Sequence, residues 1–138
     1  MKYLLDVNVL VAWGWQNHEF HTPIAKWIES VKSLDSDHRI FTSPITELGF
    51  VRVSIQISHG QVSCQQAGQL LKNMLASLSS KYGFLPDDIP SYEWPGWCKG
   101  SAQTTDAHLQ KLARSHGAVL ATMKKRIPDA FLIDSLRS

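Results

Sequence analysis

Acidic residues stand in three well-separated segments of this sequence, and side chains of this type can do metal-dependent chemistry. Asp6 interrupts the apolar run LLDVNVLVAW, and Glu47 and Asp106 each follow a short helix-opening signal. Mg²⁺ and Mn²⁺ prefer hard oxygen ligands, usually a few carboxylates together with water and a phosphate. A metal held this way polarises a phosphodiester, activates water and stabilises the leaving oxygen. We therefore take Asp6, Glu47 and Asp106 as candidate metal ligands and catalytic residues.

Two polar neighbours and one alternative explanation belong to the same set. Asn8 and Thr105 lie close to Asp6 and Asp106 in the sequence, where they could orient water molecules or carboxylates. The helix dipole favours an acidic residue in a first helical turn without any function, and this accounts for Glu47 or Asp106 taken alone. Asp6 differs, because a carboxylate within a buried run is costly without a partner. Asp6 is therefore the strongest candidate.

The elements that must position these residues alternate between short strands and amphipathic helices. Ser-Pro and Thr-Pro pairs, a Ser63–Gln66 capping box and Gly117 mark helix ends, with Thr104 or Thr105 as a further cap. Apolar segments too short for helices predict the strands, at 2–7, 39–42, 82–85, 118–122 and 130–133. This alternation indicates an α/β sandwich with a mostly parallel central sheet. Sites in such folds lie beyond the carboxyl ends of the strands, where all three acids are expected.

Composition restricts the class of protein. The 138 residues suit one domain covering 1–138, and 43% hydrophobic with 19% charged residues is an ordinary globular mixture. No apolar run is long enough to span a bilayer, so no membrane partner is expected. The net charge of +2 permits a nucleic-acid partner without requiring one. Two cysteines without CxxC spacing favour a reducing compartment, and we expect a cytoplasmic protein.

Three segments carry a family resemblance. LLDVNVLVAW, TSPITELGFVRV and TTDAHLQKLARSHGAVLAT, with FLPDD between the last two, resemble the PIN-domain ribonucleases, most closely the VapC toxins of bacterial toxin–antitoxin pairs. The resemblance implies a three-layer α/β/α sandwich and Mg²⁺- or Mn²⁺-dependent RNA cleavage. It also implies homodimers and a small antitoxin that covers the site. Asp6, Glu47 and Asp106 match the family's acidic ligands. Asn8 and Thr105 match its polar helpers.

Lys124 departs from the family pattern. After Leu-Ala-Thr the family continues with an aromatic residue and then Asp, whereas this chain has Met123 and Lys124. A cation about 4 Å from the carboxylates would disfavour a metal by roughly 1–4 kcal/mol. Lys124 is thus either an inactivating substitution or a phosphate contact beside one metal held by Asp6 and Asp106. A further alternative is that Asp129 reaches back to supply the missing acid.

Three functional hypotheses follow. The first is a metal-dependent endoribonuclease toxin of a type II toxin–antitoxin pair, with RNA and an antitoxin as partners. The alternative is a catalytically degenerate PIN domain that only binds RNA or antitoxin, which Lys124 motivates. The last is a phosphoryl-transfer enzyme with an aspartyl nucleophile at Asp6, as in haloacid-dehalogenase-like phosphatases. That class places a second Asp where this chain has Asn8.

Overall fold

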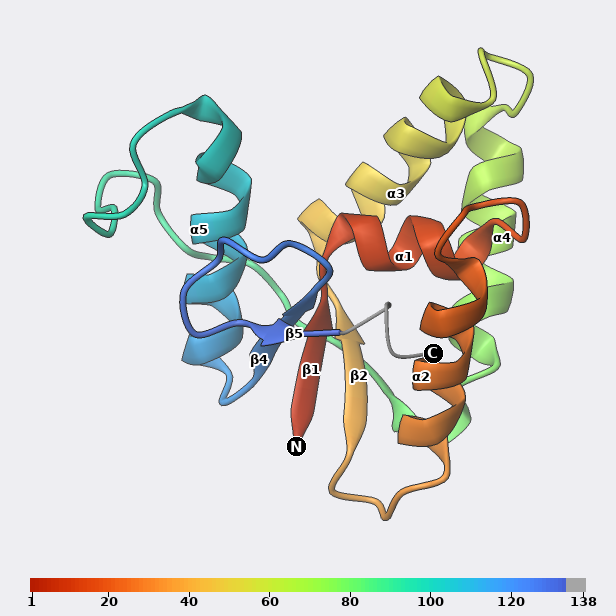
Figure 1. Ribbon diagram of the computed structural model, residues 1–138, viewed down its shortest axis with the longest axis horizontal. Coiled ribbons are helices and arrows are strands. Elements are labelled where there is room, and N and C mark those ends of the chain that lie inside the picture. The colour runs from red at the N-terminus through yellow and green to blue at the C-terminus, as the bar shows by residue number, and fades with distance from the viewer. Residues whose placement is uncertain (134–138) are drawn as a thin grey trace.

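The computed structural model describes residues 1–133, and within them a parallel sheet lies between helices (Figure 1). The strand order is β3-β2-β1-β4-β5, and every neighbouring pair is parallel. The predicted PIN-like α/β/α sandwich is confirmed, and its sheet is parallel throughout the described range. In chain order the elements are β1 (Lys2–Leu5), α1 (Val7–Gly14), α2 (His21–Lys32), β2 (Arg39–Thr42), α3 (Pro44–Ile57), α4 (Cys64–Ala76), the 3-10 turn η1 (Ser79–Lys81), β3 (Tyr82–Phe84), α5 (Ser101–Ser115), β4 (Val119–Thr122) and β5 (Phe131–Leu132).

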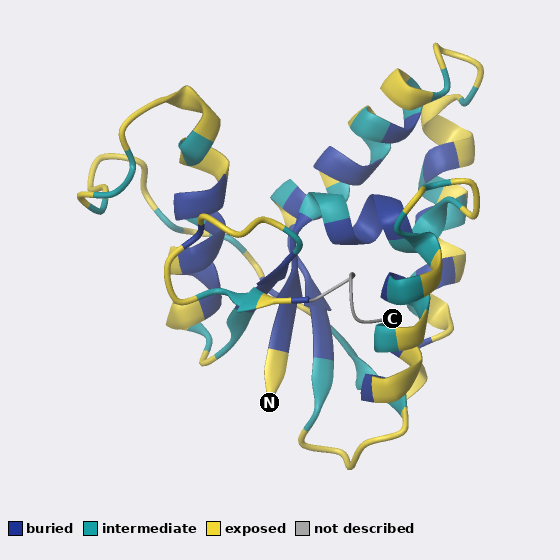
Figure 2. Cartoon of the chain, in the orientation of Figure 1, coloured by how far each residue is buried: buried dark blue, intermediate teal, exposed yellow. Residues whose placement is uncertain are grey.

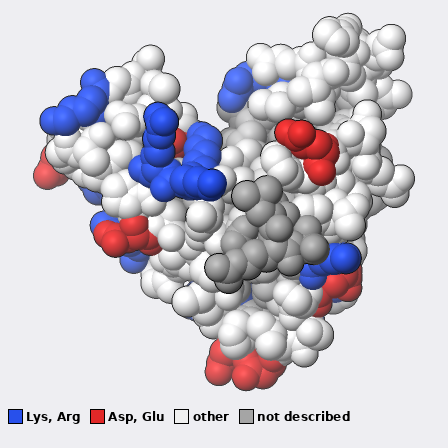
Figure 3. Space-filling model, viewed as in Figure 1, with Lys and Arg blue, Asp and Glu red and all other residues white. Residues whose placement is uncertain are grey.

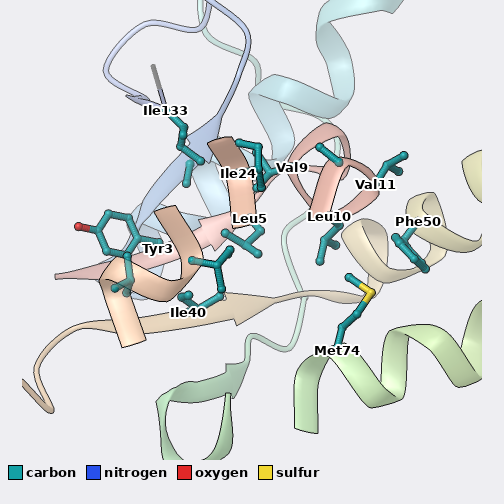
Figure 4. Packing of buried hydrophobic residues seen from close by; sticks show 14 of the residues in the cluster. Tyr3, Leu5, Val9, Leu10, Val11, Ile24, Ile40, Phe50, Met74 and Ile133 are labelled. Carbon is teal, nitrogen blue, oxygen red and sulfur yellow. The ribbon is translucent and has the colours of Figure 1, made fainter. Parts of the chain in front are cut away.

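Alternating strand residues build two separate cores. Tyr3 and Leu5 of β1 face the cluster shared with α1, α2, α3 and α4, which Figure 4 shows from close by. Leu4, between them, faces the opposite cluster, where Leu109 and Leu112 of α5 pack. This two-residue period follows from strand geometry, because successive side chains point to opposite faces. The three central strands β1, β2 and β4 are accordingly mostly buried (Figure 2), and among the described residues α5 alone covers the second face of the sheet.

The strand order creates one reversal point, between β1 and β4. From β1 the chain runs outward through β2 to β3, and then crosses through α5 to β4 on the other side of β1. The two strands pair with Leu5 opposite Ala121, so the residues that follow them, Asp6 and Thr122, emerge side by side. In open parallel sheets such a point forms a crevice that no crossover helix fills. The fold therefore brings Asp6 to the position where ligands usually bind.

Several predicted helix ends are confirmed. Ser43 caps α3 and Ser63 caps α4, each within a capping box. Gly117 ends α5 with φ +69°, and the N–H of Ala118 donates back to the Ala113 carbonyl at 2.8 Å. A positive φ at this position suits glycine, since a Cβ would be strained there.

Two predicted helix starts are wrong. α2 begins at His21 with Phe20 as its cap, so Thr22 lies inside the first turn and its side chain caps nothing. α5 begins at Ser101 with Gly100 as its cap, about one turn before the predicted Thr104 or Thr105. Proline and threonine are both tolerated within a first turn, where backbone N–H groups lack helical partners anyway. Asp106 consequently lies in the second turn of α5 rather than the first.

Candidate active site

Asp6 is held at the carboxyl end of β1 by its neighbours. Its backbone N–H donates to the carbonyl of Ala121 at 2.9 Å. Its Oδ1 accepts the N–H of Val7 at 2.8 Å, capping α1, and its Oδ2 accepts the hydroxyl of Thr122 at 2.7 Å. Only 2% of Asp6 is exposed. Each carboxylate oxygen keeps a further lone pair, so the group is oriented but can still accept a ligand.

Thr122 links Asp6 to the second acid of the site. The hydroxyl that donates to Asp6 also accepts the backbone N–H of Lys124 at 3.0 Å. The side chain of Lys124 then reaches α5, where its Nζ donates to Oδ1 of Asp106 at 2.8 Å. Asp106 is only 6% exposed. A continuous series of polar contacts therefore joins the two acids through Thr122 and Lys124.

A pocket of about 370 Å³ opens over this series of contacts, and we call it the acidic pocket. Its lining includes the predicted residues Asp6, Asn8, Thr105, Asp106 and Lys124. Within the described part of the chain, Oδ1 of Asn8 is the one buried side-chain oxygen or nitrogen without a hydrogen-bond partner. Buried acceptors are normally satisfied. A residue with an unsatisfied amide oxygen, lining the same pocket as two carboxylates, favours a cation or a hydrogen-bond donor as the occupant.

Burial and neighbouring charges set the protonation of this pocket. Burial raises the pKa of the Asp6 carboxyl; the Thr122 hydrogen bond and the Lys124 charge oppose the rise without cancelling it, and the Asp106 carboxylate adds to it. For Lys124, burial alone would lower the pKa of the ammonium group. The hydrogen bond to Asp106 and the charges of both carboxylates outweigh that effect, so the pKa of Lys124 is raised. Lys124 therefore remains a cation at neutral pH.

Glu47 lies in the first turn of α3, as predicted, but its carboxylate points to a different part of the molecule. Its Oε2 accepts the hydroxyl of Thr42 at 2.6 Å and that of Tyr82 at 3.2 Å. It lines a separate pocket of about 540 Å³ between α4 and β3, together with Leu71 and Phe84. The structure thus does not bring Glu47 into the acidic pocket.

Asp129 does not replace the acid missing at Lys124. Its Oδ2 accepts a hydrogen bond from Arg114 at 2.8 Å, and its side chain is 77% exposed. It is not among the residues that line the acidic pocket. The proposal that Asp129 reaches back across the turn is therefore wrong. The physical reason is that the Asp129 carboxylate pairs instead with the exposed guanidinium of Arg114 on α5.

The residues present fit one hard cation. Among residues 1–133, no group of three or more His, Cys, Asp and Glu side chains could hold a metal. Asp6 and Asp106 nevertheless provide carboxylate oxygens at one pocket, and Asn8, whose buried Oδ1 has no hydrogen-bond partner, lines the same pocket. Mg²⁺ is commonly held by one or two carboxylates, with water and substrate phosphate completing its coordination. The ammonium group of Lys124 competes for one of these carboxylates.

Cationic side chains surround the mouth of this region. In Figure 3, Lys and Arg side chains gather over the loop that follows β4, beside a hollow between α5 and α3. Arg52 of α3 and His18 line the acidic pocket from the opposite side. Sequence analysis missed these two residues and Thr122. His18 carries no local signal and Arg52 lies within the quoted TSPITELGFVRV segment, whereas the position of Thr122 at the end of β4, two residues before Lys124, would have pointed to it.

Comparison with known proteins adds an independent result. No protein-family model matches the chain. Ribonuclease VapC39 of Mycobacterium tuberculosis is 38% identical to it, over 98% of this chain and 94% of the relative. Ribonuclease VapC38 of the same organism is 35% identical, over 86% and 82%. Ribonuclease VapC29 is 31% identical, over 89% and 86%. The chain therefore belongs to the VapC family of PIN-domain ribonucleases.

Proposed function

We propose that this protein is a metal-dependent endoribonuclease toxin of a type II toxin–antitoxin pair. The observation that carries the proposal is the acidic pocket at the β1/β4 reversal point, with two buried carboxylates and the unpaired oxygen of Asn8. Asp6 and Asp106 would hold Mg²⁺ or Mn²⁺. When bound, the ion would supply an activated water and stabilise charge on the phosphodiester.

The chain's own residues have distinct roles in this proposal. Thr122 orients Asp6, and the backbone N–H of Lys124 in turn orients the threonine hydroxyl. Asn8 and Thr105 orient water at the pocket wall. The Lys124 ammonium group, half-exposed at the mouth, moves from Asp106 to a phosphate oxygen when RNA enters. Glu47 acts through Thr42 and Tyr82 as a positioning residue of the neighbouring strand ends.

The proposed partners follow from the same pocket. RNA would enter from the cationic rim, and a cognate antitoxin would cover the pocket in the cytoplasm. The apolar wall formed by Val11, Val53 and Ile57 gives such a protein a surface to pack against. Ile57 is 49% exposed, and Leu48, on the same helix, is 68% exposed. Exposed apolar side chains of this kind also favour a homodimer, which light scattering would test. Within residues 1–133, no helix is long and apolar enough to cross a membrane.

A degenerate PIN domain is the second candidate, and one contact favours it. The Lys124 ammonium lies 2.8 Å from Asp106 and already neutralises one of the two acids. On this hypothesis the pocket binds RNA or antitoxin without cutting.

Metal titration by calorimetry, together with RNA cleavage in Mn²⁺, separates the two candidates. The variants are wild type, Asp6→Asn and Lys124→Asp. The enzyme hypothesis expects wild type to bind metal and cut RNA, and Asp6→Asn to do neither. A wild type without either property, combined with a Lys124→Asp variant that gains both, would establish the degenerate domain.

A further inference from the structure

A second hollow adjoins the acidic pocket, and its lining differs in chemistry. This hollow has a volume of about 460 Å³, and Trp97, Gln103, Arg126 and Ile127 line it. Asp106 and Lys124 line both spaces, so the ion pair stands between them. If Lys124 binds a phosphodiester, one of the two nucleotides that this phosphate joins would therefore lie next to this hollow. We call it the aromatic hollow.

The floor of the aromatic hollow is suited to a planar ring. Trp97 is half-buried, packing against the core cluster beneath α5, and it also lines the hollow. Ile127, which is 7% exposed, belongs to the same cluster and supports that floor. Proteins that bind single-stranded RNA stack unpaired bases on aromatic side chains in this way. A tryptophan fixed by core packing is already held in place before a base arrives.

Apart from the Asp106 carboxylate, which is paired with Lys124, the polar side chains that line the aromatic hollow can donate hydrogen bonds. Oε1 of Gln103 accepts the backbone N–H of Lys99 at 2.7 Å, which leaves the Nε2 amino group of Gln103 to donate. The guanidinium of Arg126 is a donor only. Within residues 1–133, no carboxylate lies within ion-pair distance of Arg126. Two donors select a base edge with adjacent acceptors, as guanine presents with N7 and O6, whereas adenine pairs an acceptor with a donor.

We propose that the aromatic hollow is a nucleobase subsite that accepts guanine next to the scissile phosphate, with Trp97 stacking on the base and Gln103 and Arg126 contacting its acceptor edge. This inference rests on the proposed ribonuclease function, and it adds a sequence preference to it. Trp97, Gln103 and Arg126 would then determine specificity, while Asp6 and Asp106 would carry the reaction.

Binding of short RNAs to the non-cleaving Asp6→Asn protein tests this subsite. The probes are fluorescein-labelled oligouridine decamers whose central nucleotide is guanosine, adenosine or an abasic residue, measured by fluorescence anisotropy. Base stacking on an aromatic side chain changes affinity by about 5- to 150-fold. We expect the guanosine RNA to bind tighter than the abasic RNA by a factor in this range, and adenosine to be intermediate.

The matched variants separate stacking from stability. Trp97→Leu keeps an apolar side chain against the core but removes the stacking surface, and it should bring the guanosine and abasic RNAs to equal affinity. Trp94→Leu is the control, because Trp94 is in the same loop but lines a different pocket. Gln103→Glu keeps an acceptor for Lys99 and replaces the donor, so it should abolish the preference for guanosine over adenosine.

Three outcomes would overturn the inference. The first is equal affinity of the protein for all three RNAs. The second is a Trp97→Leu variant that loses the same amount of affinity for every RNA. The third is a Trp94→Leu variant that removes the difference between the guanosine and abasic RNAs as Trp97→Leu does. These results are distinguishable from failure of the proposed function. RNA cleavage by wild type with no base preference defeats only the subsite. A guanosine preference without cleavage by wild type in Mn²⁺ defeats only the nuclease.

Discussion

At the scale of single residues, one lysine decides the electrostatics of the pocket. Lys124 is bound through its backbone to Thr122 and through its ammonium group to Asp106. Its ammonium group therefore places a positive charge beside Asp106, as a bound metal cation would. Its side chain is 48% exposed, so solvent screens the interaction and reduces its strength.

Replacing this lysine should tighten metal binding. Lys124→Met removes the competing charge while keeping an unbranched side chain, and we expect the affinity for Mn²⁺ to rise about 5- to 10-fold, near the lower end of the Coulombic range because of screening. Isothermal calorimetry measures this directly. Lys125→Met is the matched control, since Lys125 is exposed and does not line the acidic pocket. Equal affinities for the two variants would contradict this role of Lys124.

Asp6 is a buried carboxylate whose ionisation opposes the stability of the fold. Burial raises the pKa of Asp6 in the folded protein. The folded state therefore binds a proton more readily than the unfolded chain, and stability declines as the pH rises through the folded pKa. In the absence of metal, the Tm of wild type should therefore fall as the pH rises from 4 to 7. Asp6→Asn removes the titrating group while exchanging one accepting oxygen for an amino group, so its Tm should fall less over the same pH range. Thermal melts in EDTA at both pH values test this, and an equal or larger fall for Asp6→Asn would refute it.

At the scale of elements, two threonines end β2 and β4, the strands on either side of β1, and each binds a different carboxylate. Thr122 of β4 bonds to Asp6, whereas Thr42 of β2 bonds to Glu47 and Tyr82. Both threonines are completely buried. The ends of β4 and β2 therefore orient different carboxylates, one in the acidic pocket and one beside it.

Valine substitutions at these two strand ends should separate stability from metal binding. Thr122→Val and Thr42→Val each remove a buried hydroxyl and leave a polar partner unsatisfied, which costs about 1–3 kcal/mol of folding free energy. We expect only Thr122→Val to weaken Mn²⁺ binding as well, because Asp6 loses its orienting donor. Denaturant unfolding and calorimetry on both proteins measure the two effects. A matching loss of metal affinity in Thr42→Val would instead place Glu47 in the metal site.

At the scale of the whole molecule, the site joins both layers of the sandwich. Asp6 follows β1 in the centre of the sheet, and Asp106 belongs to α5, the helix that covers the opposite face from α1 and α2. A cation bound to both acids would connect the two cores. Metal binding should therefore act on the stability of the entire fold.

Metal should raise the melting temperature of the protein. A ligand that binds only the folded state, at 100 times its Kd, stabilises it by about 2.7 kcal/mol. We expect Mn²⁺ to raise the Tm of wild type by several degrees, and EDTA to reverse the change. Asp106→Asn and Asp6→Asn should both lose the shift. If Asp106→Asn retained the whole shift, Asp106 would not be a ligand.

The sequence by itself determined the class of fold and named most of the polar residues that line the acidic pocket. Apolar segments too short for helices, cap residues such as Ser43 and Ser63, and the acid within LLDVNVLVAW are local signals, and each depends only on near neighbours. The parallel sheet and the strand-end location of Asp6 follow from them. The family motifs added the remaining candidates.

Only the tertiary structure decided how side chains from distant segments pair. It joined Lys124 to Asp106, turned Glu47 toward Thr42 and Tyr82, and placed Asp129 on Arg114. Sequence spacing does not fix these pairs, because they depend on strand order and on which helix packs across which strand end. The start of α5 was missed for a related reason. α5 begins at Ser101 after Gly100, which has no side chain to cap it, so the threonines inside the helix resembled its start.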